Sequence, residues 1–275
     1  MESIDGGSRP LVVGTVVYLN SRPLTYRVSE EADDVRVVAD LPSRLADRLA
    51  SGELSAALLP SIISFSRADQ VVISDACVAC EGPVRSVKLF CRVPPAEIRT
   101  LALDEGSRTS VALARILLRE RFGLQPRLEC LPIGASWEEN PADAILLIGD
   151  RCMQAPPGRF EAVWDLGGEW TRWTGLPFVF AVWMAHPGPD ALRLGRLLTA
   201  ARDRGKARLA EIARSEAPAL GLREADCLSY LRDHLRFDLG ARERQGLELF
   251  HKLAQRHGLA PAGGNLVFID QRAAG

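Results

Sequence analysis

The 275-residue chain has no long hydrophobic run and almost no excess of either charge. No stretch approaches the roughly 18 consecutive apolar residues of a membrane-spanning helix, so we expect no such helix. The 34 basic and 35 acidic residues nearly cancel, and no run of five like charges occurs. Nucleic-acid-binding proteins usually carry a basic excess or patch. We therefore expect no membrane partner and no nucleic-acid partner for what is otherwise an ordinary folded composition.

Several signatures of well-known chemistry are also missing. The chain has no GxxxxGK[ST] loop, no GxGxxG after a strand, no HExxH and no GxSxG. The four histidines all lie in the last third, from His186 onward. The pair Cys77 and Cys80 has redox or zinc spacing, but no second pair exists, which favours two small apolar residues in a strand. We expect neither a metal nor an organic cofactor.

What the chain does contain is an alternation of short β-branched runs and helical patterns. Strands are predicted at 11–19, 35–39, 56–59, 71–73, 77–79, 86–91, 100–103, 127–131, 144–148, 163–166 and 176–184. Helices are predicted from Pro42 to before Gly52, from Ser107 to Gly123, as one long helix over 192–212, and at 222–235 and 243–257. Such alternation predicts an α/β fold with parallel strand pairing.

A proline pair, Pro94-Pro95, separates two α/β series, and a strand returns near residue 180 before a helical tail. This arrangement predicts a two-lobed binding-protein fold. Residues 1–93 with 184–275 would form the first lobe, and residues 94–183 the second. One continuous doubly wound sheet remains the alternative.

Four segments are polar where strands are predicted to end or helices to begin. In α/β sheets, ligands bind outside the carboxyl ends of strands. The segment Asp104–Ser110 places several hydroxyls at a predicted helix start with Ser107 as N-cap, which suits an anion. Together with the two tryptophans of the segment Asp165–Phe178, this helix start favours a small anionic ligand that also contacts aromatic rings. Each of these residues taken alone could instead serve helix capping or core packing. The segments are Tyr18–Pro23, Gly82–Ser86, Asp104–Ser110 and Asp165–Phe178.

At this level of detail the chain resembles a known enzyme family. The carrying motifs are VGTVVYLNSRPL, GPVRSVKLF, LDEGSRTSVALARILL, AILLIGD and DLGGEWTRWTGLPFVFAVW, and the tail YLRDHLRFDLGARERQGLELFHKLAQRHGL agrees as well. Together they are similar to the chorismate dehydratase family of the futalosine route to menaquinone, from about Leu11 to Phe268. The resemblance implies a type II periplasmic-binding-protein-like fold with a ligand between two lobes.

The resemblance also implies a reaction and its residues. Chorismate would lose water to give 3-[(1-carboxyvinyl)oxy]benzoate without a cofactor, with Asn20 and Ser86 in the active site. The helix start at Ser107, Thr109 and Ser110 would lie there too. No base is evident in the polar segments, and the identity of the proton acceptor stays open. The resemblance suggests a carboxylate of the substrate as one hypothesis. With the polar and aromatic pattern, the predicted substrate-binding residues are Ser107, Arg108, Thr109, Ser110, Trp170, Thr174 and Gly175.

Two alternatives stay open. The sister enzyme 1,4-dihydroxy-6-naphthoate synthase shares the implied fold, but that family uses a Thr-Thr pair and a histidine base, whereas this helix start reads Ser-Arg-Thr-Ser and no histidine precedes His186. A non-catalytic small-anion-binding protein usually carries a leader or lipobox. The opening MESIDGGSRP shows neither, from which we expect a cytoplasmic protein. Oligomeric state stays open.

Overall fold

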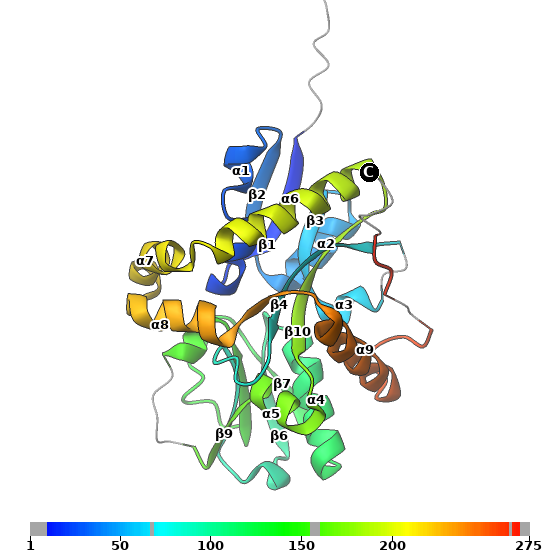
Figure 1. The fold of residues 1–275 in the computed structure, drawn as a ribbon. Helices are drawn as coiled ribbons and strands as arrows, with labels where there is room; N and C mark the ends of the chain where they lie inside the picture. Colours follow the sequence, from blue (N-terminus) through cyan, green and yellow to red (C-terminus); the bar gives the residue numbers. More distant parts are fainter. Residues whose placement is uncertain (1–9, 67–68, 155–159, 264–265, 270–275) are drawn as a thin grey trace, which may run out of the picture.

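The computed structural model describes residues 10–66, 69–154, 160–263 and 266–269 and contains two mixed β-sheets (Figure 1). The first sheet has the order β11-β4-β10-β3-β1-β2 and the second β7-β6-β8-β5-β9. We call each sheet with its covering helices a lobe. The first sheet comprises β1 (Leu11–Val16), β2 (Val35–Asp40), β3 (Ala56–Pro60), β4 (Val71–Cys80), β10 (Phe178–Ala185) and β11 (Arg236–Asp238). The second comprises β5 (Val87–Cys91), β6 (Thr100–Asp104), β7 (Arg127–Leu131), β8 (Ala144–Ile148) and β9 (Ala162–Asp165).

The chain passes between the sheets twice, from β4 to β5 and from β9 back to β10. The predicted lobe boundaries at 93 and 184 therefore differ from the sheets by one strand at each crossing. β5 belongs to the second sheet, and β10 belongs to the first. The proline pair at 94–95 only turns the chain inside the second lobe, where a short 3-10 turn η2 (Pro95–Glu97) joins β5 to β6.

Strand pairing is parallel only in part. β1 pairs in parallel with β2 and β3, and β6 with β7 and β8, as the strand–helix alternation predicts. The two strands that follow a crossing run the other way: β10 is antiparallel to β3 and β4, and β5 to β8 and β9. Each crossing thus inserts one antiparallel strand into an otherwise parallel core, and the first sheet has a second antiparallel strand at its edge, since β11 runs antiparallel to β4.

The helices cover both lobes, and two of them correct the predicted boundaries. The long helix expected over 192–212 is two helices, α6 and α7, and the helix expected over 222–235 is α8 followed by a π-helical turn η4. The helices are α1 (Val28–Glu31), α2 (Pro42–Ala50), α3 (Ser61–Ser64), α4 (Thr109–Phe122), α5 (Leu166–Thr174), α6 (Pro189–Lys206), α7 (Leu209–Leu220), α8 (Glu224–Ser229) and α9 (Ala241–Arg256). The remaining short turns are η1 (Leu19–Thr25), η3 (Asp150–Met153) and η4 (Tyr230–His234).

The helical tail ties the two lobes together. β11 pairs with β4 of the first sheet, and α9 packs both against β10 of the first sheet and against α4 of the second lobe. Figure 1 shows α8 beside the junction of the lobes, with α6 lying across the first sheet. The largest fully buried side chains are spread over both lobes and the tail, among them Trp170, Trp183, Tyr230, Phe178 and Phe250. Within the described ranges, no helix has the length and hydropathy to cross a bilayer.

Candidate active site

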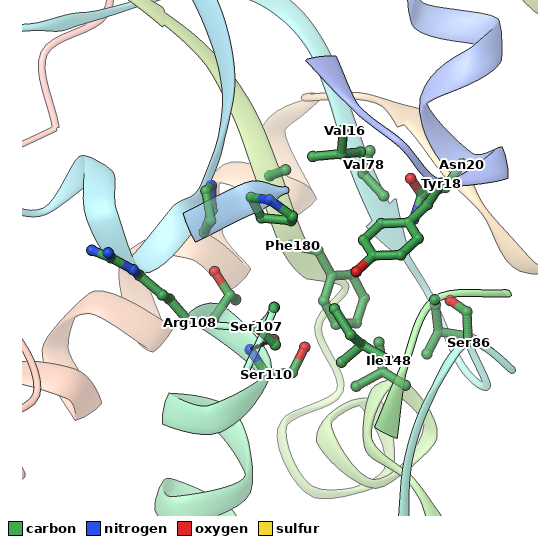
Figure 2. A pocket seen from close by; sticks show the side chains of 18 residues that line it. Val16, Tyr18, Asn20, Val78, Ser86, Ser107, Arg108, Ser110, Ile148 and Phe180 are labelled. Carbon is green, nitrogen blue, oxygen red and sulfur yellow. Dashed lines mark hydrogen bonds between the residues drawn. The ribbon is translucent and has the colours of Figure 1, made fainter. Parts of the chain in front are cut away.

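A pocket of about 580 Å³ opens between the two lobes (Figure 2). Both lobes supply its walls, because β1, α2, β3, β4 and β10 contribute from one side and β5, α4 and β8 from the other. A volume of this size suits a small molecule. The lining residues are Val16, Tyr18, Asn20, Pro42, Pro60, Val78, Val84, Ser86, Val87, Gly106, Ser107, Arg108, Thr109, Ser110, Ile148, Gly149, Phe180 and Ala181.

Asn20 reaches the pocket from the turn after β1. This strand ends at Val16, earlier than predicted, and the chain then tightens into η1. The buried hydroxyl of Ser21 donates to the carbonyl oxygens of Val16 at 2.7 Å and Tyr18 at 2.9 Å, which holds the turn in shape. The Asn20 Oδ1 atom is buried and has no hydrogen-bond partner among the described residues. It is an open acceptor in the pocket wall.

Ser86 lies at the first crossing between the lobes. The residue before it, Arg85, has φ +66°, a left-handed conformation that non-glycine residues rarely adopt. The carboxylate of Asp165 stabilises this bend by accepting from the backbone N–H groups of Val84 at 2.8 Å and Arg85 at 2.6 Å. The bend turns the buried Ser86 hydroxyl toward the pocket. Backbone strain of this kind tends to occur at functional sites.

Tyr230, in the π-helical turn of the tail, connects these two side chains. Its hydroxyl donates to Ser86 Oγ at 2.8 Å and hydrogen-bonds to the Asn20 side chain. The ring is fully buried, and burial raises the pKa of the Tyr230 hydroxyl well above its usual value, so the hydroxyl stays protonated. Sequence reasoning missed this residue, because a tyrosine in a helical pattern is typical of core packing.

The start of α4 forms the opposite wall of the pocket. Ser107 Oγ accepts the backbone N–H of Ser110 at 3.2 Å, so Ser107 caps the helix as expected even though the helix itself begins at Thr109. Thr109 Oγ1 accepts the backbone N–H of Ile62 at 3.3 Å, a bond from the second lobe to the first. Figure 2 shows the Arg108 side chain extending away from Asn20 and Ser86. The helix start and its hydroxyls suit an anionic group.

A third set of contacts closes the pocket beside Tyr18. Gly149, with φ +74°, leaves room for the tyrosine ring, since a Cβ there would lie 2.5 Å from Tyr18 Cε1. The next residue, Asp150, accepts the backbone N–H of Leu19 at 3.2 Å. Burial raises the pKa of Asp150 to about 6, against the opposing effects of that hydrogen bond and of Arg22. This carboxylate was not singled out from the sequence, although it ends a predicted strand.

Comparison with known proteins places the chain in a family. Residues 11–256 match a family model described as menaquinone biosynthesis. A chorismate dehydratase from Thermus thermophilus is 36% identical over 262 residues, covering 88% of this chain and 94% of the relative. The chain belongs to the menaquinone biosynthesis family.

Proteins of known structure share the fold of this chain. A protein from Archaeoglobus fulgidus superimposes with a TM-score of 0.71 at 13% identity, covering 92% of this chain and 99% of that one. The periplasmic aliphatic sulphonate-binding protein from Escherichia coli gives 0.64 at 16% identity, covering 97% and 92%. The expected periplasmic-binding-protein-like fold is therefore confirmed, and the alternative of one continuous sheet is wrong.

The pocket of this family member offers no ionisable proton acceptor of its own. Among the described residues that line it, none is His, Asp or Glu, and Arg108 is the single charged side chain. The described ranges also hold no group of three or more His, Cys, Asp or Glu side chains placed to bind a metal ion. Cys77 and Cys80 both lie buried within β4.

Three of the predicted binding residues lie outside the pocket lining. Trp170 and Thr174 belong to α5 and Gly175 directly follows it, so this segment is a helix and its end, and not the polar cleft wall that we expected. The fully buried Trp170 donates its indole N–H to the carbonyl oxygen of Pro177 at 3.1 Å and packs edge-on against Phe178. Thr174 donates to the Trp170 carbonyl oxygen, and Gly175 ends the helix with φ +70°. These contacts are those of core packing and of a helix end, which was the alternative explanation for this segment.

Proposed function

We propose that this protein is a chorismate dehydratase, a hydro-lyase that converts chorismate to 3-[(1-carboxyvinyl)oxy]benzoate and water in menaquinone biosynthesis. The observation that carries the proposal is the pocket itself. It joins polar, uncharged Asn20 and Ser86 to a helix start suited to an anion, and its described lining holds no side-chain base. The relative from Thermus thermophilus bears the same activity in its name.

The pocket walls match the parts of this substrate. Chorismate has an apolar ring and two carboxylates, and the pocket has apolar walls at Val78, Ile148 and Phe180. One carboxylate fits the start of α4, where Ser107 and Ser110 lie. The backbone N–H groups and positive dipole end of the helix favour an anion there. Arg108, at the same helix start, is placed to attract the second negative charge.

The reaction removes a ring proton and the hydroxyl on the neighbouring carbon. The electron pair of the broken C–H bond forms the new ring double bond, and the C–O bond breaks with its pair passing to the departing oxygen. Aromatisation supplies the driving force, so the protein must chiefly orient the substrate and exclude water. A substrate carboxylate takes the proton, Asn20 orients the departing hydroxyl, and Ser86 stabilises the negative charge that develops on its oxygen.

The location and partners of the enzyme follow from the same proposal. Its partner is a small-molecule substrate that enters between the lobes, without a bound metal or organic cofactor. A cytoplasmic location is part of the proposal. The sulphonate-binding protein from Escherichia coli is similar to this chain in fold alone, so we do not extend its role to this chain.

The decisive experiment is incubation of the purified, chelator-treated protein with chorismate, followed by mass analysis. We expect a product lighter than chorismate by one water that co-elutes with authentic 3-[(1-carboxyvinyl)oxy]benzoate. Ser86→Ala serves as the matched control for contaminating activity. Binding of chorismate without turnover would favour the non-catalytic alternative. Turnover of the substrate of 1,4-dihydroxy-6-naphthoate synthase in its place would favour the sister enzyme.

A further inference from the structure

The Tyr230 hydroxyl can donate only one hydrogen bond, and this limits which of its two partners, Ser86 and Asn20, can donate to it. A phenol has one proton to donate and lone pairs to accept. The Tyr230 hydroxyl donates that proton to Ser86 Oγ at 2.8 Å. The Asn20 side chain also hydrogen-bonds to the Tyr230 hydroxyl, and its Oδ1 atom has no partner among the described residues. The Asn20 amide nitrogen is therefore the donor in that contact.

This arrangement decides which of the two side chains presents a hydrogen-bond acceptor to the pocket and which presents a donor. With its N–H directed to Tyr230, Asn20 presents Oδ1, the buried atom that has no partner in the described part of the chain. Buried acceptors are nearly always satisfied, so this one calls for a ligand donor. Ser86 accepts from Tyr230, and its own proton remains free to be donated. Figure 2 shows Asn20 and Ser86 on the same side of the pocket, next to Tyr18.

The substrate offers a matching group. Ionised chorismate has a single hydrogen-bond donor, its ring hydroxyl, which is also the leaving group. An acceptor at Asn20 can only pair with that hydroxyl, and a donor at Ser86 can then contact the same oxygen as negative charge develops on it. The opposite polarity, with Asn20 as donor and the Ser86 proton given to Tyr230, would leave Ser86 no proton to donate to the departing oxygen.

The tail is built to hold Tyr230 at this point. The residue begins a π-helical turn, a rare geometry that is often found at functional sites. At the other end of that turn, His234 Nδ1 lies 2.9 Å from the carbonyl oxygen of Pro83, in the same crossing segment that carries Ser86. Both ends of the turn are thus anchored beside the active-site serine.

From these contacts we propose that Tyr230 is a positioning residue that makes Asn20 the acceptor and Ser86 the donor for the leaving hydroxyl. The proposal rests on the proposed dehydratase function. Tyr230 acts through its two partners and need not touch the substrate, since it does not line the pocket. This gives the C-terminal tail, which lies outside both crossing segments, an indirect part in the chemistry, through Asn20 and Ser86.

The test compares Tyr230→Phe with Tyr26→Phe, which removes a hydroxyl that is hydrogen-bonded to Glu211 at 2.8 Å. We expect Tyr230→Phe to lower kcat by about 10- to 100-fold, less than loss of a direct donor, with KM changed little. Tyr26→Phe should retain wild-type values. In a Ser86→Ala background, Tyr230→Phe should cost less than about threefold more, because residues that act as a unit are not additive. Wild-type kcat in Tyr230→Phe, or fully multiplicative effects, would overturn the proposal.

A second measurement needs no turnover. The side-chain amide signal of Asn20, assigned by its loss in Asn20→Ala, should shift upfield in Tyr230→Phe and stay in place in Tyr26→Phe. An unmoved signal would contradict the proposed donor direction whatever the activity. Failure of the wild-type protein to convert chorismate would instead refute the proposed function, and the amide shift would still decide the arrangement of the three side chains.

Discussion

At the scale of single residues, the place of Ser86 depends on a strained neighbour. Arg85 has φ +66°, and a non-glycine residue in a sparsely populated region costs on the order of 1–3 kcal/mol. Three backbone N–H groups donate to Asp165, those of Val84, Arg85 and Gly168. Hydrogen bonds to a carboxylate are stronger than neutral ones, so they offset the strain. The second crossing segment therefore holds the first in its active shape.

The first prediction concerns the two pocket side chains. Ser86→Ala and Asn20→Ala should each lower kcat/KM by roughly 10²–10³, the usual effect of losing one oriented group that serves the transition state. Both variants should keep the thermal midpoint within a few degrees. Ser51→Ala, at an exposed serine just after α2, is the control. If both pocket variants turned over chorismate at the wild-type rate, these residues would have no part in the reaction.

At the scale of elements, the start of α4 combines capping and binding. The Ser107 hydroxyl accepts the Ser110 N–H, the role expected of an N-cap. We expect Ser107→Ala to lower the free energy of unfolding by about 1 kcal/mol. That corresponds to a fall of about 2–4 °C in the thermal midpoint. Scanning calorimetry measures it, and an unchanged midpoint would show that the cap contributes nothing to stability.

Thr109 differs from Ser107 because its hydroxyl joins the lobes. Thr109→Val keeps the shape of the side chain but leaves the buried backbone N–H of Ile62 without its acceptor. An unpaired buried donor costs about 1–3 kcal/mol. We expect a lower thermal midpoint together with a higher KM for chorismate, since the closed pocket loses a bond between the lobes. A higher KM with an unchanged midpoint would mean instead that the hydroxyl contacts the substrate directly.

The outcome of the sequence analysis also differs from element to element. Most strands were predicted well, because β-branched runs bounded by Gly and Pro have few other structures available. The strands expected at 71–73 and 77–79 are the single strand β4, and β11 was not predicted. The helix α5 was not predicted, because Gly167 and Gly168 are typical of loops. The structure needs small residues there for close packing: a Cβ on Gly167 would lie 2.5 Å from Cys80 Sγ. The helix is capped by Asp165, whose side chain accepts from Gly168.

The site shows the same limit. Asn20, Ser86 and the four residues of the α4 start were found because strand ends and helix starts are where α/β folds bind ligands. Tyr230 was not found because it is 144 residues from Ser86, and no periodicity reports a contact across that separation. Gly149 and Asp150 were not predicted as site residues for a related reason, because their importance depends on how closely the two lobes approach each other.

At the scale of the whole molecule, the lobes meet on both sides of the pocket. The Thr109–Ile62 bond lies at the α4 side, and the Asp150–Leu19 bond lies beside Tyr18 and Gly149. Both connect a backbone N–H of the first lobe to a side chain of the second. The two bonds differ in one respect, because only Asp150 can ionise. Closure beside Tyr18 is therefore sensitive to pH.

Substitution of Asp150 tests that sensitivity. In the folded protein, burial raises the Asp150 pKa to about 6 from its usual value of 3.8. Between these values the folded state binds a proton that the unfolded state has released, so stability falls as the pH rises from about 4 to above 6. Asp150→Asn keeps an acceptor for the Leu19 N–H and cannot ionise. It should match the wild type near pH 4 and exceed it by about 2 kcal/mol near pH 8.

Thermal midpoints of both proteins across this pH range give the difference directly, because the other titrating groups contribute equally to each. Asp33→Asn, at an exposed carboxylate, is the matched control. The raised pKa belongs to the closed arrangement, in which the first lobe covers Asp150. A difference between Asp150→Asn and wild type that stays constant from pH 4 to pH 8 would therefore show that Asp150 is open to water in solution and that the lobes do not meet beside Tyr18.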